Sequence, residues 1–449
     1  MITRSFPMAI ISQVALSMQT VLTETADHLA PETGLIKRQR QLSGASCAQT
    51  LVFGWLSNPD ATLEELAQTA TAIGVNITPE AVFQRFTFVA SHFLKRLLDS
   101  SIEQVISANP VAIEVLRRFS GVYLLDSSIV TLPDALADVW QGCGGSEKNS
   151  SASVKLSVCL NMTGGDLGLH LENGCTQDKS SPLATFSLPV GSLRSADLGY
   201  FSLPRLAQMS EDGAYWLTRV KVQCTLTCDT NSKAQRYELY EFLQSKDANG
   251  IDVRIRLGKT EKLHCRLLAV RVPEEVATKR RRQRRARLKE KGKTPSRRQL
   301  QMADWTVFAT NALEQLLSLE DAIVLMRLRW QIKLLFKRWK QHGRIDKWRS
   351  EKPWRIFCEL YAKLIGMCVQ HWLLLTSAFS NPARSLVKAV KTIRRHAMQI
   401  ACAVASQELH QLLEVCQIIA SCLATGCRMN KRKKEPNTYQ LLLALEENP

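Results

Sequence analysis

A basic stripe follows one face of a predicted helix between Asp321 and Lys340. This segment contains neither Gly nor Pro, which is typical of an uninterrupted helix. At helical spacing, one face collects two apolar and four cationic side chains: Met326, Arg329, Lys333, Phe336, Lys337 and Lys340. Such a helix is suited to rest on a protein core and to contact a polyanion. The alternative is a solvated amphipathic face.

Two aspartates follow short apolar segments that we interpret as strands. Asp126 comes after the apolar residues of GVYLLDSS, and Asp197 lies in ADLGYF, where Gly199 allows a tight exit from the strand. From the residues alone, an aspartate at such a place can simply cap a turn. Neighbouring strands of one sheet can also bring two distant aspartates together, and the two carboxylates could then act as a pair.

A second concentration of positive charge begins at Lys279, in the run KRRRQRRARLKEKGK. The alternatives are a solvated tail and a surface that binds DNA phosphates, and we prefer phosphate binding. Binding should then weaken steeply with salt, because each neutralised phosphate releases counterions. We expect contacts from four arginines of the run: Arg281, Arg282, Arg284 and Arg285.

Composition favours a polyanionic partner inside the cell. The 449-residue chain has a formal net charge of +18, which favours nucleic acid over a membrane surface. The opening MITRSFPMAI has no long apolar segment, so we expect no secretory signal, and no apolar stretch is long enough to span a bilayer. The 13 cysteines form no paired CxxC motif, which favours a reduced cytoplasmic compartment. No phosphate loop of the Gly-rich Lys-Ser/Thr type is present.

We divide the chain into five regions by the change from helical to strand patterns. The N-terminal region contains a helix-turn-helix-like segment, with a capping box at Thr62 and Glu65, a stop at Gly74 and a new helix after Thr78. A plain helical hairpin is the alternative. The regions are 1–112, a helical DNA-binding region; 113–213, the first part of a catalytic core; 214–312, a β-rich insertion with the basic run; 313–375, the second part of the core; and 376–449, a helical C-terminal region.

Four motifs in this order resemble those of DDE transposases of bacterial insertion sequences, in insertion-sequence family four. They are DSS, DLGYF, the W-x-x-x-x-T-N that follows the basic run, and RWQI-x-LLFKRWK. The signature of that family is Tyr, two residues, Arg, three residues, Glu, six residues, Lys. Arg329 and Lys340 match it, whereas Met326 stands at the Tyr position and Lys333 at that of the catalytic Glu.

The resemblance implies a ribonuclease-H-like α/β fold, in which a mixed sheet with a β-strand insertion is flanked by helical N- and C-terminal regions. It assigns catalysis and metal binding to Asp126 and Asp197, with Mg²⁺ or else Mn²⁺ as cofactor and Lys333 in the third acid's place. It also assigns DNA contacts to Arg329, Lys340 and Met326, and stacking on a flipped base to Trp305, for which a core position is the alternative. The implied partners are double-stranded terminal inverted repeats and target DNA, bound by a homodimer on the bacterial nucleoid.

The resulting hypothesis is a transposase that cleaves transposon ends and transfers the strand to target DNA. Two Mg²⁺ ions held by carboxylates could activate the nucleophile and stabilise the leaving oxygen. Lys333 would place a like charge where a ligand of the second ion is needed, so we expect impaired activity. The alternatives are a transposon-end-binding protein that does not cut, and a ribonuclease-H-like nuclease without transfer activity.

Overall fold

The computed structural model divides into two compact units that share strand β1 (Val122–Thr131). Unit 1 comprises residues 1–112, 127–176 and 330–440, and unit 2 comprises 113–126, 177–329 and 441–449. The residues that the structure describes are 8–38, 41–108, 111, 113–144, 151–230, 233–246, 248–290, 292–381, 383–430 and 438–447.

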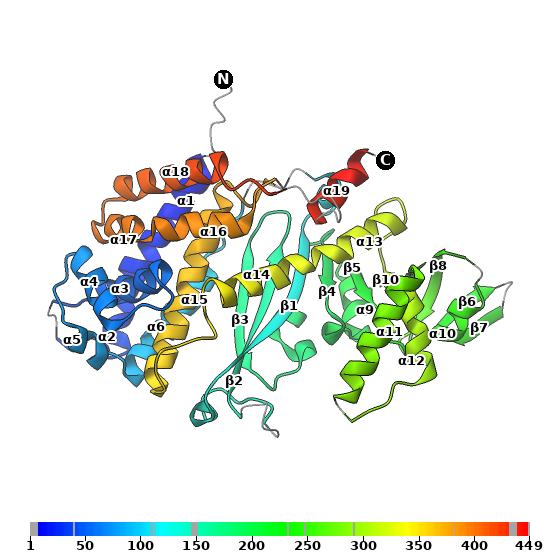
Figure 1. Ribbon diagram of the computed structural model, residues 1–449. Helices are drawn as coiled ribbons and strands as arrows, with labels where there is room; N and C mark the ends of the chain where they lie inside the picture. The colour runs from blue at the N-terminus through cyan, green and yellow to red at the C-terminus, as the bar shows by residue number, and fades with distance from the viewer. Residues whose placement is uncertain are drawn as a thin grey trace. The chain divides into compact units, whose positions relative to one another are not determined.

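Unit 1 is mainly helical (Figure 1). Two antiparallel strands, β2 (Ser153–Asn161) and β3 (Leu167–Asn173), extend its sheet beyond the second half of β1. A short 3-10 turn, η2 (Asp134–Leu136), follows β1. The helices are α1 (Met8–Gln19), the π-helix η1 (Thr20–Thr25), α2 (Ala26–Glu32), α3 (Gly44–Ser57), α4 (Leu63–Ala72), α5 (Pro79–Gln84), α6 (Phe88–Glu103), α14 (Trp330–Gln341), α15 (Pro353–Leu375), α16 (Leu386–Arg395), α17 (Ala397–Ala405) and α18 (Leu409–Thr425).

Helix α15 forms the centre of unit 1 and packs on α3 and α6. It is buried on nearly every side, as expected for a helix that is apolar all round. Two of its buried charges form a pair: Lys363 Nζ lies 2.7 Å from Glu359 Oε1 and also donates to the carbonyls of Arg344 and Lys347. Within the described part of the chain, no helix has the length and apolarity needed to cross a bilayer.

The helical hairpin near the N-terminus follows its capping signals. The Thr62 side chain accepts from the amide of Glu65 and the Glu65 side chain accepts from the amide of Thr62, which completes the capping box of α4. Gly74 follows the end of α4 with φ of +88°, and Thr78 caps α5. Helix α5 ends at Gln84, so the second helix of the predicted helix-turn-helix is a single short element and α6 begins separately.

Unit 2 contains most of a mixed sheet. Its strands lie in the order β1-β4-β5-β10-β9-β8-β6-β7; β1, β4 (Leu193–Ala196) and β5 (Tyr215–Arg219) are parallel, and the remaining pairings are antiparallel. The other elements are α7 (Glu114–Arg117), η3 (Asp178–Ser180), α8 (Pro182–Thr185), η4 (Leu198–Tyr200), α9 (Leu203–Glu211), β6 (Thr225–Thr230), β7 (Lys233–Glu238), α10 (Leu239–Gln244), β8 (Gly250–Leu257), β9 (Leu263–Arg271), α11 (Glu274–Lys289), α12 (Arg297–Gln301), η5 (Met302–Asp304), β10 (Trp305–Thr310) and α13 (Leu319–Leu328). Helix α19 (Thr438–Glu447) begins at the end of unit 1 and continues into unit 2.

The predicted fold class is confirmed: the sheet is mixed, helices flank it, and the insertion consists of antiparallel strands (Figure 1). These strands arise where apolar and polar residues alternate, as in IDVRIRL and KLHCRLLAV. Trp216, Phe242, Leu267 and Trp305 belong to the apolar cluster that joins this sheet to its helices.

The predicted uninterrupted helix from Asp321 to Lys340 is wrong at one residue. Helix α13 ends at Leu328, α14 begins at Trp330, and Arg329 lies between them as a turn. No glycine or proline marks this break, and Arg329 keeps right-handed backbone angles. Its amide bonds instead to the carbonyl of Arg327, which interrupts the regular i to i−4 pattern.

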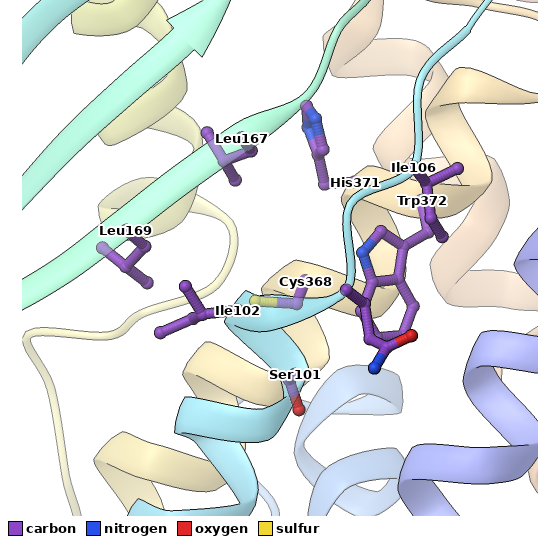
Figure 2. A pocket seen from close by; sticks show the side chains of 9 residues that line it. Ser101, Ile102, Ile106, Leu167, Leu169, Cys368, His371 and Trp372 are labelled. Carbon is purple, nitrogen blue, oxygen red and sulfur yellow. The ribbon is translucent and has the colours of Figure 1, made fainter. Parts of the chain in front are cut away.

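A water-sized cavity of about 10 Å³ lies among residues of α6, β3 and α15 in unit 1 (Figure 2). His371 lines it and donates from Nε2 to the carbonyl of Gly165 at 2.6 Å. Gly165 has φ of +81°, and a Cβ there would lie 2.5 Å from Leu375 Cδ2, so the turn requires glycine. Burial lowers the pKa of His371 to about 4.

We expect acid to destabilise the protein through His371. Its pKa is about 4 in the folded state and near 6.5 in the unfolded state, so unfolding takes up a proton between these values. The contribution of neutral His371 to the unfolding free energy is therefore fully present above about pH 6.5 and is lost as the pH falls towards 4. Between about pH 7 and pH 5, the wild type should lose about 2 kcal/mol more unfolding free energy than His371→Gln, measured by urea denaturation.

Glutamine keeps a donor for Gly165 and cannot titrate, and all other titrating groups are common to both chains. Parallel pH dependence of the two proteins would contradict this role of His371.

Candidate active site

The strand register brings three charged residues to one edge of the sheet in unit 2. The parallel pairing of β1 with β4 ends at Leu125 and Ala196, and Ala196 also pairs with Thr218 of β5. The next residues along the three strands are Asp126, Asp197 and Arg219. Because the three strands are parallel and their pairing ends at the same level, these side chains become neighbours although they are distant in sequence.

Arg329 connects the two carboxylates. Its Nη1 lies 3.4 Å from Asp126 Oδ2 and 3.2 Å from Asp197 Oδ1. The side chains of Asp126 and Arg329 are 10% and 7% exposed, whereas that of Asp197 is 38% exposed. The site is therefore an acidic pair, neutralised in part by one guanidinium and open to solvent on the Asp197 side.

Helix α13 positions Arg329 through contacts along its length. Ser318 and Asp321 form a capping box at its start, and Arg118 Nη1 lies 2.7 Å from Asp321 Oδ2. Near its end, Ser195 Oγ of β4 donates to Met326 Sδ at 3.5 Å. Met326 is 7% exposed and packs towards β4, which leaves it no open face for the predicted DNA contact.

The chain must turn sharply after Asp197. Residues Leu198–Tyr200 form η4 directly after the aspartate, and a Cβ at Gly199 would collide with the carboxylate of Asp178. Glycine therefore lets η3 and η4 approach closely, and this contact fixes the position of Asp197 at the end of β4.

The two carboxylates fit a hard divalent cation, which prefers oxygen ligands and retains water molecules beside a few carboxylates. Across the described ranges, no group of three or more His, Cys, Asp or Glu side chains is placed to hold a metal ion. Within these ranges, the site therefore offers two carboxylates and no third acid beside them.

Lys333 and Lys340 lie on α14, in unit 1. Lys333 Nζ is 5.3 Å from the ring centroid of Trp330, a cation–π contact on an exposed ring. Lys340 Nζ donates to the carbonyl of Ile129 at 2.7 Å, and burial lowers its pKa. Lys340 is thus held against β1 three residues beyond Asp126.

Helix α11 contains the basic run, and one of its faces lines a groove of about 670 Å³. The residues of this face follow helical spacing: Arg280, Gln283, Arg284, Arg287 and Leu288. Of the four predicted DNA-binding arginines, Arg284 lines the groove. Arg281 forms ion pairs with Glu274 and Asp304, and Arg282 and Arg285 are exposed away from the groove.

Three arginines of this groove were missed from the sequence: Arg219, Arg280 and Arg287. Helical periodicity within the run was the available signal for the last two, since they share a face with Arg284. Trp305 also borders the groove, but it is 4% exposed, belongs to the apolar core and lies 5.0 Å from the guanidinium of Arg271. In this structure Trp305 therefore occupies the core position considered as the alternative.

Removing the Arg329 cation should destabilise the fold, because Asp126 and Asp197 would lose the guanidinium that lies near both carboxylates. We expect Arg329→Gln to lower the unfolding free energy by about 2 kcal/mol in the presence of a chelator, less than for a fully buried pair because Asp197 is partly solvated. Adding Asp126→Asn should restore most of this loss in a double-mutant cycle measured by urea denaturation.

Arg327→Gln is a matched control on the same helix, because Arg327 is exposed and should change stability by less than about 0.5 kcal/mol. Additive effects of Arg329→Gln and Asp126→Asn would show that the contact between these side chains carries no coupling energy.

Comparison with known proteins identifies the family. Residues 117–368, more than half of the chain, match the transposase DDE domain. The transposase for insertion sequence element IS231B from Bacillus thuringiensis subsp. berliner is 27% identical over 363 residues, which cover 76% of this chain and 75% of that protein. The transposase for insertion sequence element IS1151 from Clostridium perfringens is 25% identical over 372 residues, which cover 78% and 77%.

Among solved structures, the piggyBac transposase synaptic complex with hairpin DNA aligns with 96% of this chain and 88% of that chain, at 9% identity and a TM-score of 0.48. The family assignment rests on the domain match. The chain belongs to the transposase DDE domain family.

Proposed function

We propose that this chain binds the terminal DNA of an insertion sequence and that its site is built for metal-dependent strand cleavage and strand transfer. The observation that carries this proposal is the convergence of Asp126 and Asp197 around Arg329, just beyond the point where the parallel pairing of β1 with β4 ends. The finer assignment to insertion-sequence family four rests on the signature residues Arg329 and Lys340.

Each residue has a distinct role in this proposal. Asp126 and Asp197 would hold a divalent cation, Mg²⁺ or Mn²⁺, which would supply Lewis-acid activation of the attacking hydroxyl and stabilisation of the leaving oxygen. Arg329 neutralises the carboxylates when the cation is absent and binds a phosphate oxygen when it is present. Lys340, held at Ile129, offers a second cation to the DNA backbone. Cutting both ends of an element requires two sites, which favours a homodimer acting on nucleoid DNA.

Lys333 limits the chemistry in this proposal. It stands where the resemblance places the third acid, and an ammonium group cannot ligate a metal ion. Among the described residues no third acid joins Asp126 and Asp197, so a two-metal mechanism would lack one of its protein ligands. The second candidate function is therefore an end-binding protein that does not cut. A nuclease without strand transfer is less favoured, because it would need the same third ligand.

Replacing Lys333 by glutamate should restore cleavage. We expect the Lys333→Glu protein to cut terminal DNA about 100-fold faster or more than the natural chain with Mg²⁺ or Mn²⁺, because the new carboxylate can hold a cation. Strand cleavage is followed on labelled terminal DNA under single-turnover conditions.

Lys337→Glu is the matched control, with the same charge change at an exposed position of the same helix. Equal cutting by the natural chain and the Lys333→Glu protein would refute the proposed consequence of Lys333. Similar gains from both glutamates would point to a general charge effect.

The carboxylate pair should be needed for cutting and dispensable for binding. In the Lys333→Glu background, we expect Asp126→Asn to abolish detectable cleavage while the dissociation constant for terminal DNA stays within about threefold. Binding is measured by fluorescence anisotropy in the presence of a chelator. Loss of binding together with a lowered melting temperature would assign Asp126 a role in folding instead.

A further inference from the structure

We propose that the groove between α11, the end of β5 and the start of β10 binds a single unpaired DNA strand through its phosphates. This inference rests on the proposed function and extends it, because it assigns a strand-binding site next to the carboxylates. Leu198 lines the groove and directly follows Asp197 in the chain, and Arg219 lines it at the end of β5. A strand in the groove therefore passes close to Asp197.

The charge of the groove has one sign. Four arginines line it, namely Arg219, Arg280, Arg284 and Arg287, and its lining includes no Asp or Glu. A concave surface lined by one sign of charge concentrates counter-ions and focuses the field. Phosphodiester groups are the anions of DNA that would meet this field at regular spacing.

Two of the arginines are held in place by the protein itself. Arg280 donates to the carbonyls of Ala303 and Trp305 and to Thr306 Oγ1, at 3.4, 3.2 and 3.0 Å. Arg284 donates to the carbonyl of Gln299 at 2.5 Å. Neutral oxygens hold these guanidinium groups without cancelling their charge, so the cations are oriented before any anion arrives.

The other cations are not neutralised locally. In the described residues no carboxylate forms an ion pair with Arg287. Burial and the Arg329 guanidinium lower the pKa of Arg219, although Asp197 raises it. Burial and, after it, the Arg219 guanidinium lower the pKa of Arg280. This row of repelling guanidinium groups would be relieved by an anion that spans them.

The remaining lining favours an unpaired strand over a duplex. Apolar side chains from three segments share the groove with amides: Val220, Val222, Leu288, Met302, Gln223 and Gln283. A duplex presents mainly phosphates and sugars and keeps its base faces stacked inside. An unpaired strand can place bases on apolar surface and edges against amides while its phosphates meet the arginines. The volume of about 670 Å³ is within the range of pockets that enclose drug-sized ligands, which are similar in size to a nucleotide.

The test uses two matched double variants of the full chain. Arg284→Gln with Arg287→Gln removes two charges from the groove face, and Arg282→Gln with Arg285→Gln removes two from the outer faces of the same helix. The probe is a mixed-sequence single strand of about 12 nucleotides. Affinity is measured by fluorescence anisotropy with a chelator present, from about 50 to 200 mM salt.

The groove variant should bind the strand about tenfold or more weakly, and its salt slope should fall by about 1.4, the value for two lost phosphate contacts. The outer variant should change affinity by less than about threefold. A duplex of the same sequence should lose less than about threefold in affinity with either variant. Loss of the Arg284 hydrogen bond could unfold α11, and a lowered melting temperature would report this. The Arg287→Glu variant, which keeps Arg284, then tests the groove instead.

Equal losses with both double variants would overturn the inference, because charge anywhere on α11 would then suffice. A duplex loss as large as the strand loss would also overturn it and assign the groove to duplex DNA. The outcome is separable from cleavage: strand binding that depends on the groove would stand even if Lys333→Glu never cuts. If the Lys333→Glu protein cuts terminal DNA while the groove variants bind the single strand as tightly as the natural chain, the groove proposal is rejected and the proposed function stands.

Discussion

The contact of one guanidinium with two carboxylates is the constraint on which the rest of unit 2 depends. Asp126 and Asp197 emerge side by side because β1 and β4 are parallel and in register, and two neighbouring carboxylates repel each other. Arg329 offsets this repulsion from a helix whose start is fixed by Arg118 and Asp321. A capped helix and a buried ion pair therefore hold the two carboxylates close together. This arrangement is more typical of a functional site than of an element that only stabilises the fold.

Positive charge is organised in the same way next to this pair. Arg329, Arg219 and Arg280 influence one another electrostatically, and the α11 face continues the row along the groove. Hydrogen bonds from arginines to backbone carbonyls support α11, a helix in which Ala277 is the buried residue. Because apolar packing contributes little to this helix, its conformation depends on polar contacts with β10 and α12. Such regions are where a polyanion can stabilise the structure by binding.

The proposed replacement of an acid by Lys333 is compatible with the fold. Its side chain lies over the exposed ring of Trp330, and α14 packs through other residues, such as Ile332, Leu335 and Trp339. Exchanging an acid for a lysine at this position leaves the apolar face of the helix unchanged. The proposed loss of the third metal ligand is therefore compatible with family membership, since folding depends on packing and catalysis depends on the ligand set.

Local patterns in the sequence determined the elements: alternation marked the strands, and capping residues such as Thr62 and Thr78 marked helix starts. The motifs singled out Asp126 and Asp197, because a family resemblance records residue types in order. Only the tertiary structure decided that the two aspartates share Arg329, because strand register is a long-range property. It also decided that α13 ends before Arg329, where no glycine or proline gives a local signal, and that Arg280, Arg284 and Arg287 face the groove. A run of arginines has no preferred face until the helix packs against the sheet, and that packing separates the cations turned to the groove from those turned to solvent.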